Sequence, residues 1–280
     1  MHICLCKPSG HTWLVAGGDL LGQFADQIDD IADVVQDAGT RRLPHGALLT
    51  GTSPPGLSLY CVTGRRRSGS ARPTANIYVD GLNLYYGCLK GTAYKWLDLN
   101  ALFETLLPNY DIKRIRYFTA RISARPDNPG TAQRQDAYIR ALRTLPNVSI
   151  FLGKFLVSTQ RMPLADPKSG NKTVEVIKTE EKGSDVNIAT YLLIDAFHRD
   201  SDLAVVVSND SDLCEPIRIV KDEFKVPVGL LIPHSRTSEA LRRLNPTFLK
   251  KIRGGPLSVC QFPDPVIDSR GRKITKPPGW

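Results

Sequence analysis

The pattern of apolar and polar positions becomes regular at about residue 75. From there to about residue 252, short apolar runs alternate with longer amphipathic stretches. The strand candidates are 76–79, 114–119, 148–157, 173–177, 203–207 and 227–232. The helix candidates are 98–107, 131–145, 184–197 and 213–224. This alternation predicts an α/β fold with a mainly parallel central sheet and helices on both faces, and a ligand site outside the carboxyl ends of the strands.

Two of the predicted helices have clear local signals. Asp98 is a favourable N-cap for the first, and Pro108 ends it. The helix over 184–197 is the most strongly patterned one. Its predicted apolar face consists of Val186, Ala189, Leu193 and Ala196.

The regions on either side of this pattern look different. Residues 1–74 mix Gly and Pro turns with one acidic amphipathic stretch and a basic linker, so we expect a loosely packed N-terminal extension. Residues 163–171 form a turn-rich insertion between two strands. Residues 253–280 are Pro-rich and predict an extended tail that packs over the domain or hangs free. The folded domain is predicted over 75–252.

The charge of the chain is concentrated in its second part. The net charge is +9, and residues 1–70 hold six basic and six acidic residues, so the excess lies in 71–280. A basic domain attracts polyanions such as nucleic acid, although many soluble proteins are equally basic.

Several functional classes lack their sequence signals. The six cysteines do not repeat a CxxC spacing, which argues against a zinc ribbon and favours reduced thiols in the cytoplasm. No apolar run is long enough to cross a bilayer, and no signal peptide is evident. His198 and His234 lie in no catalytic or metal-binding pattern. Nucleotide-binding glycine motifs are absent, and Leu82 replaces the second Asp of a haloacid-dehalogenase-like phosphatase.

Acidic residues follow strands or begin helices at three places. An apolar strand leads into Asp80, with Asn83 three residues later. Asp185 lies in the first turn of the helix over 184–197. Asp210 and Asp212 follow the strand over 203–207. Each acid alone has an ordinary structural explanation as a turn residue or helix cap.

Their joint placement favours a metal site. Carboxylates crowded at one sheet edge repel one another, and a hard cation that prefers oxygen ligands usually offsets this repulsion. Magnesium accepts one or two carboxylates directly and leaves room for phosphate oxygens. It would polarise a phosphoryl group and lower the pKa of a water.

The chain resembles a known family in these segments. YVDGLNLYYG, EEKGSDVNIATYLL and VVVSNDSDLCEPI are similar to the three signature blocks of NYN domains, in the LabA-like branch of the PIN-like nucleases. The resemblance runs from about residue 76 to about residue 251 and includes KWLDLNALF. It implies a PIN-like doubly wound sandwich and metal-dependent endoribonuclease activity on RNA, single-stranded or structured, with Mg²⁺ or Mn²⁺.

The resemblance also implies site residues. Metal-site acids fall on Asp80, Asp185, Asp210 and Asp212, and a polar helper on Asn83. We expect Asp80 and Asp210 to bind metal directly. Asp185 and Asp212 would act through water or position the attacking water. Asn83 would contact a phosphate oxygen or orient Asp80. Roles for Glu181 and Ser208 stay open, as do RNA contacts by Lys182, Arg121 and one of Tyr85 and Tyr86.

Three functions compete at this level. The first is a metal-dependent ribonuclease. The second is an RNA-binding or regulatory module with little or no turnover, which the basic charge fits equally well. The third is a DNA nuclease or a phosphatase acting on small esters. The sequence does not distinguish an RNA substrate from a DNA substrate. It does not define the oligomeric state either, so a homodimer stays open.

Overall fold

A computed structural model describes residues 72–122, 130–164 and 172–280. The predicted N-terminal extension lies outside these ranges except for its last three residues, and most of the turn-rich insertion also lies outside them. The proposed boundaries at 74 and 252 therefore stay predictions.

Seven strands form the central sheet, in the order β4-β3-β2-β1-β5-β6-β7. Neighbouring strands are parallel except for β3 and β4, which form an antiparallel hairpin. The strands are β1 (Thr74–Asp80), β2 (Asp111–Ala120), β3 (Val148–Pro163), β4 (Thr173–Lys182), β5 (Leu203–Val207), β6 (Val228–Ile232) and β7 (Phe248–Lys251). This arrangement confirms the predicted mainly parallel α/β fold, and it is consistent with a PIN-like sandwich.

The order in which successive strands are added to the sheet reverses beside β1. The chain builds β1, β2 and β3 outward on one side, then returns to place β5 on the other side of β1 and continues outward through β6 and β7. The carboxyl ends of β1 and β5 therefore lie next to each other at a topological switch point, where open α/β sheets usually bind ligands.

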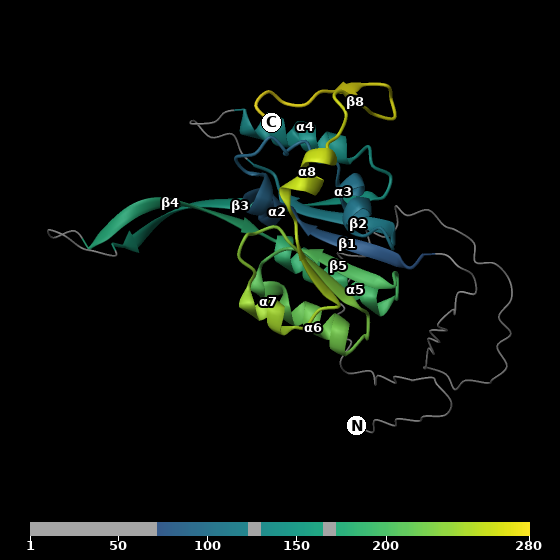
Figure 1. The fold of residues 1–280 in the computed structure, drawn as a ribbon. Helices are drawn as coiled ribbons and strands as arrows, with labels where there is room; N and C mark the ends of the chain where they lie inside the picture. Colours follow the sequence, from purple (N-terminus) through teal and green to yellow (C-terminus); the bar gives the residue numbers. More distant parts are fainter. Residues whose placement is uncertain (1–71, 123–129, 165–171) are drawn as a thin grey trace, which may run out of the picture. The chain divides into compact units, whose positions relative to one another are not determined.

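Helices cover both faces of the sheet (Figure 1). On one face lie α3 (Leu99–Leu106), α4 (Thr131–Leu142) and α8 (Gly254–Val259). On the other lie α5 (Ser184–Phe197), α6 (Cys214–Asp222) and α7 (Glu239–Arg243). Two short turns of helix lie just after strand ends. α2 (Gly81–Leu84) follows β1 directly and continues into the π-helix η1 (Tyr85–Leu89), and the 3-10 helix η2 (Ser211–Leu213) follows β5 after a short loop. No helix among the described residues is long and apolar enough to cross a membrane.

Each face of the sheet has its own apolar core. Side chains alternate along the strands, so Ile77 and Val79 enter the core under α3 and α4, whereas Tyr78 enters the core under α5 and α6. All five residues of β5 and all five of β6 are buried, as expected for parallel strands covered on both faces.

A buried polar network joins the sheet to α5. The Arg116 guanidinium donates two hydrogen bonds to the Asp195 carboxylate, at 2.8 and 2.7 Å, and the Tyr78 hydroxyl donates a third at 2.8 Å. Arg116 also lies 4.4 Å from the centre of the Tyr191 ring. Asp195 is thus satisfied by partners on two strands, which explains why a carboxylate can occupy the buried side of a helix.

The predicted apolar face of α5 is confirmed only in part. Ala196 is buried and Leu193 packs against the same core, but Val186 is 69% exposed. The buried side of the helix consists of Ser184, Ile188, Leu192, Asp195 and Ala196. The pairing of Asp195 with Arg116 turns that side toward the sheet, and Val186 then points to solvent.

The hairpin of β3 and β4 is longer than predicted. The two strands pair in register from Lys154 opposite Lys182 to Pro163 opposite Thr173, and the hairpin extends away from the rest of the domain (Figure 1). Glu181 therefore lies in a strand that delivers it to the start of α5.

The C-terminal segment packs on the domain. After α8, β8 (Val266–Ile267) and β9 (Lys273–Ile274) form a small antiparallel pair. The Trp280 ring then lies 6.5 Å from Trp96 and 5.8 Å from Tyr138 between ring centres. The sequence left open whether this tail packs over the domain or hangs free, and in the structure it packs on the domain.

Candidate active site

Asp80 is the last residue of β1 and is 6% exposed. Its Oδ1 accepts a hydrogen bond from the Asn83 backbone N–H at 2.9 Å, so the side chain caps α2. Gly81 lets the chain turn here, because a Cβ at this position would lie 2.6 Å from Cζ of Tyr117 and 2.7 Å from the Phe118 carbonyl oxygen. The Asp-Gly pair therefore places a buried carboxylate at the strand end.

The loop after β5 is hydrogen-bonded to Asp80. The buried Ser208 hydroxyl donates to Oδ2 of Asp80 at 3.0 Å and accepts from the Asp210 backbone N–H at 3.1 Å. Oδ1 of Asp210 accepts from the Asp212 N–H at 3.0 Å, which caps η2. Asp210 is half-buried, and Asp212 is exposed. Ser208 thus connects the predicted acids of two neighbouring strands.

Asn83 and Asn209 form a second connection. The side-chain oxygen of Asn83 accepts a hydrogen bond from the Asn209 backbone N–H at 3.0 Å. The expected roles for Asn83 were a phosphate contact or the orientation of Asp80. In the structure its side chain holds the loop that carries Asp210, while its backbone N–H holds Asp80.

The start of α5 brings two more acids to this edge. Oε1 of Glu181 accepts hydrogen bonds from the backbone N–H and the hydroxyl of Ser184, at 3.2 and 2.6 Å. Asp185 follows in the first helical turn and is half-buried. Glu181 therefore holds the first residue of α5, next to the N-cap Gly183, whereas the sequence had left the role of Glu181 open.

The carboxylates affect one another electrostatically. Burial, opposed by the hydrogen bonds from Asn83 and Ser208, raises the pKa of Asp80 to about 6, and the charges of Asp185 and Asp210 add to the rise. Burial also raises the pKa of Asp185, and Asp210, Glu181 and Asp212 contribute. The structure therefore gathers all four predicted acids within electrostatic reach of one another, together with Glu181.

This donor set fits a hard divalent cation in its chemistry. The groups are carboxylate oxygens, and their mutual repulsion is the cost that a cation would offset. As the side chains stand, no three Asp, Glu, His or Cys side chains in the described ranges lie close enough together to hold an ion. A site with one or two direct carboxylates and several waters, as Mg²⁺ prefers, needs no such group of three.

Other candidate residues lie farther from the acids or on the surface. Tyr85 packs against the core, whereas Tyr86 is 58% exposed with Lys90 over its ring. Lys182 pairs with Glu180 at 3.2 Å, and Arg121 lies 3.7 Å from Asp136. Tyr86, Lys182 and Arg121 thus occupy ordinary solvent-exposed positions, and none of them forms a hydrogen bond with the acids of the site.

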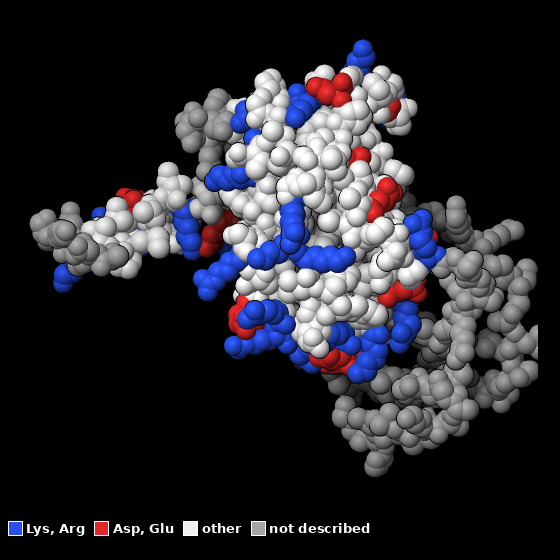
Figure 2. Space-filling model, viewed as in Figure 1, with Lys and Arg blue, Asp and Glu red and all other residues white. Residues whose placement is uncertain are grey.

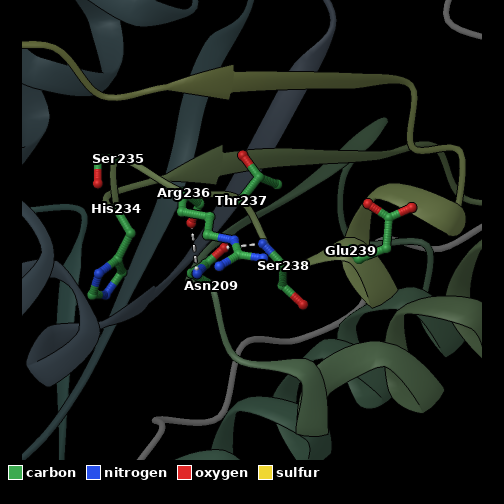
Figure 3. A pocket seen from close by; sticks show the side chains of 7 residues that line it. All are labelled: Asn209, His234, Ser235, Arg236, Thr237, Ser238 and Glu239. Carbon is green, nitrogen blue, oxygen red and sulfur yellow. Dashed lines mark hydrogen bonds between the residues drawn. The ribbon is translucent and has the colours of Figure 1, made fainter.

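Sequence reasoning missed the polar loop after β6. A cavity of about 470 Å³ is lined by Asn209 and residues 234–239, which we call the 234–239 loop (Figure 3). The signal was available: this loop follows a buried parallel strand, so its residues reach the same sheet edge as Asp80 and Asp210.

One family model matches most of the chain. The family model described as NYN domain matches residues 74–253. A curated relative, 6-hydroxy-3-succinoylpyridine 3-monooxygenase HspA of Pseudomonas putida, is 32% identical over 249 residues, which cover 77% of this chain and 78% of that protein. A solved structure of a Vibrio parahaemolyticus protein of unknown function covers 67% of this chain and 98% of its own, with 19% identity and a TM-score of 0.45.

Proposed function

The chain belongs to the NYN domain family, a part of the PIN-like nuclease superfamily, and from this premise we propose that it is a metal-dependent ribonuclease. We place it in the LabA-like branch because of its three signature blocks. We also propose RNA, met in the cytoplasm, as its partner. One observation carries the proposal: the acids of β1, α5 and the loop after β5 meet at the switch point of the sheet.

The residues divide into direct and indirect ligands. Asp80 and Asp210 would hold Mg²⁺ or Mn²⁺, because Ser208 binds both of their segments and keeps the two carboxylates together. When bound, the cation supplies charge neutralisation at the phosphoryl group and lowers the pKa of a water. The half-buried Asp185 and the exposed Asp212 would orient the attacking water.

The remaining contacts are positioning contacts. Asn83 connects the turn after β1 to the loop after β5, so the relative placement of Asp80 and Asp210 depends on it. Ser208 is buried at the centre of the same connection. A catalytic geometry of this kind tolerates only small displacements, and these two residues limit them.

The experiment is cleavage of labelled single-stranded RNA and DNA by the full chain, with Mn²⁺, Mg²⁺ or EDTA. We compare wild type with Asp210→Asn and with the surface control Asp222→Asn, whose side chain pairs with Lys221. Metal-dependent RNA cleavage that is lost only in Asp210→Asn supports the proposal. Binding of RNA without cleavage by wild type supports the regulatory module instead, and cleavage of DNA alone supports the DNA nuclease of the third alternative.

The Pseudomonas relative provides a second candidate activity. Its name describes monooxygenation of a hydroxypyridine, and the 32% identity over 77% of this chain favours testing that chemistry. A monooxygenase consumes oxygen and a reductant. Oxygen uptake that depends on 6-hydroxy-3-succinoylpyridine, with a reduced nicotinamide as electron donor, would therefore support this candidate against the nuclease.

A further inference from the structure

The cavity at the 234–239 loop shares a residue with the acid site. Asn209 lines the cavity and directly precedes Asp210. Its side-chain oxygen accepts from the Ser238 backbone N–H at 2.7 Å, and its Nδ2 donates to the Arg236 carbonyl oxygen at 3.1 Å (Figure 3). Its own backbone N–H donates to Asn83. One asparagine therefore holds the 234–239 loop and the acid loop in a set relationship.

A second contact holds the other end of the loop. Gly87 of η1 packs against His234: a Cβ at Gly87 would lie 2.9 Å from the imidazole Cδ2 and 3.0 Å from Nε2. The Lys251 ammonium donates to the Ser235 carbonyl oxygen at 2.5 Å. The loop is thus fixed against the turn after β1, against β7 and against the acid loop, so its backbone has a defined position beside the loop that carries Asp210.

The lining of the cavity suits an anion. It offers the Arg236 guanidinium, the His234 imidazole and the hydroxyls of Ser235, Thr237 and Ser238. Arg236 is exposed, and no carboxylate in the described part of the chain forms an ion pair with its guanidinium.

The one carboxylate of the lining is already neutralised. Glu239 forms ion pairs with Arg242 and with Arg243, the second at 3.4 Å. Lys and Arg side chains also gather over β7 and α7 on the face shown in Figure 2. The exposed basic residues of those two elements are Arg242, Arg243, Lys250 and Lys251.

A nucleic-acid strand needs such a region next to the acids. Four carboxylates repel a polyanion, and a bound cation offsets this only at the scissile phosphate. The neighbouring phosphates require their own donors, and a guanidinium with adjacent hydroxyls binds phosphate oxygens in a bidentate manner.

We propose that the cavity of the 234–239 loop binds the RNA backbone phosphate next to the scissile one, with Arg236 as its principal ligand. His234 and the loop hydroxyls complete the subsite. This inference rests on the proposed ribonuclease function, because it assigns the substrate strand of the same site.

The test measures binding of a short fluorescent single-stranded RNA to the full chain in the non-cleaving Asp210→Asn background, over a series of salt concentrations. We expect Arg236→Ala to weaken binding about 10-fold, which corresponds to about 1.4 kcal/mol, because the variant loses a charge-assisted contact to phosphate. The slope of log affinity against log salt concentration should become shallower by about 0.7, because one phosphate contact is lost. Arg236→Lys should restore part of the salt dependence, and His234→Ala should weaken binding to a smaller degree.

The matched control is Arg270→Ala, which removes the same charge from the exposed turn between β8 and β9. Equal binding by Arg236→Ala and Arg270→Ala would overturn the subsite even if wild type cleaves RNA. Conversely, if wild type cleaves nothing but Arg236→Ala alone still weakens RNA binding, the nuclease assignment fails and the phosphate subsite stands.

Discussion

The side-chain oxygen of Asn83 accepts the backbone N–H of Asn209 across 126 residues of chain. This hydrogen bond crosses from the turn after β1 to the loop after β5, and the two segments carry Asp80 and Asp210. Since Asn209 also binds the 234–239 loop, one polar chain connects three strand ends at the same edge of the sheet.

Replacing Asn83 by Ala should loosen this edge without unfolding the domain. The backbone N–H of residue 83 can still cap Asp80, but the N–H of Asn209 loses its partner. We expect a loss of about 1–3 kcal/mol of stability, measured by urea unfolding. Any RNA cleavage should fall more steeply than stability predicts. An unchanged cleavage rate at full folding would show that Asn83 has no positioning role.

Asp210→Asn should weaken metal binding strongly while the fold is retained. The variant keeps the side-chain oxygen that caps η2 but removes the charge of a proposed direct ligand. We expect metal affinity to fall by roughly 100-fold and any RNA cleavage to fall with it. Titration calorimetry with Mn²⁺ measures the first effect. Asp222→Asn, with the same change on the surface, should bind Mn²⁺ as wild type does.

Asp80→Asn should stabilise the metal-free protein at neutral pH. The pKa of Asp80 is raised from 3.8 to about 6, so the folded state binds this proton more tightly than the unfolded state does. The contribution of Asp80 to the free energy of unfolding therefore falls as pH rises from about 4 to 6. Above pH 6 the ionised carboxylate destabilises the folded state by about 3 kcal/mol at most. A thermal melt in EDTA at pH 7.5 measures the gain. The difference between the two proteins should shrink at pH 4, and a variant less stable at pH 7.5 would contradict the assignment.

Metal binding by wild type should weaken in acid. A proton competes with the cation at Asp80, so affinity should drop as pH falls through about 6, rather than through the ordinary range of an aspartate near 4. The measurement is the rise in melting temperature caused by Mn²⁺ at pH 5 and at pH 7.5. A rise of equal size at both values would exclude Asp80 as a ligand with a raised pKa.

Gly81→Ala should distort the turn that carries Asp80. The new methyl group would meet the Tyr117 ring and the Phe118 carbonyl oxygen at under 3 Å. We expect a loss of roughly 1–3 kcal/mol by urea unfolding. Gly255→Ala is the control, because a Cβ there meets nothing within 4 Å. It should be neutral or slightly stabilising in α8, and equal losses in both variants would refute the steric explanation.

Local sequence was sufficient for most elements. The buried run Leu203–Val207 has the predicted bounds because polar residues flank it on both sides. Asp98 accepts a hydrogen bond from the Ala101 N–H at 3.1 Å and caps α3. This cap was predicted because an acidic residue directly precedes an amphipathic stretch. The acids could also be placed at one edge, since parallel strands share the side on which their carboxyl ends lie.

Other features depended on partners far away in the chain. Nothing local in β1 and β5 says that they are neighbours, because apolar runs of similar composition can pair with any strand of the sheet. The buried side of α5 depends on Asp195. An acid in a helix is expected to face solvent, and Asp195 is buried only because it pairs with Arg116, 79 residues earlier in the chain. The connection through Asn209 likewise needs three separate strand ends.

The sequence by itself therefore determined the α/β class, the positions of the buried strands and the edge where the acids lie, because these follow from hydrophobic periodicity and chain direction. The tertiary structure alone decided the strand order, the rotation of α5 and the hydrogen bonds that join Asp80, Asp210 and the 234–239 loop. The physical reason is that a buried polar group is stable only with a partner, and these partners are brought together by folding rather than by nearness in sequence.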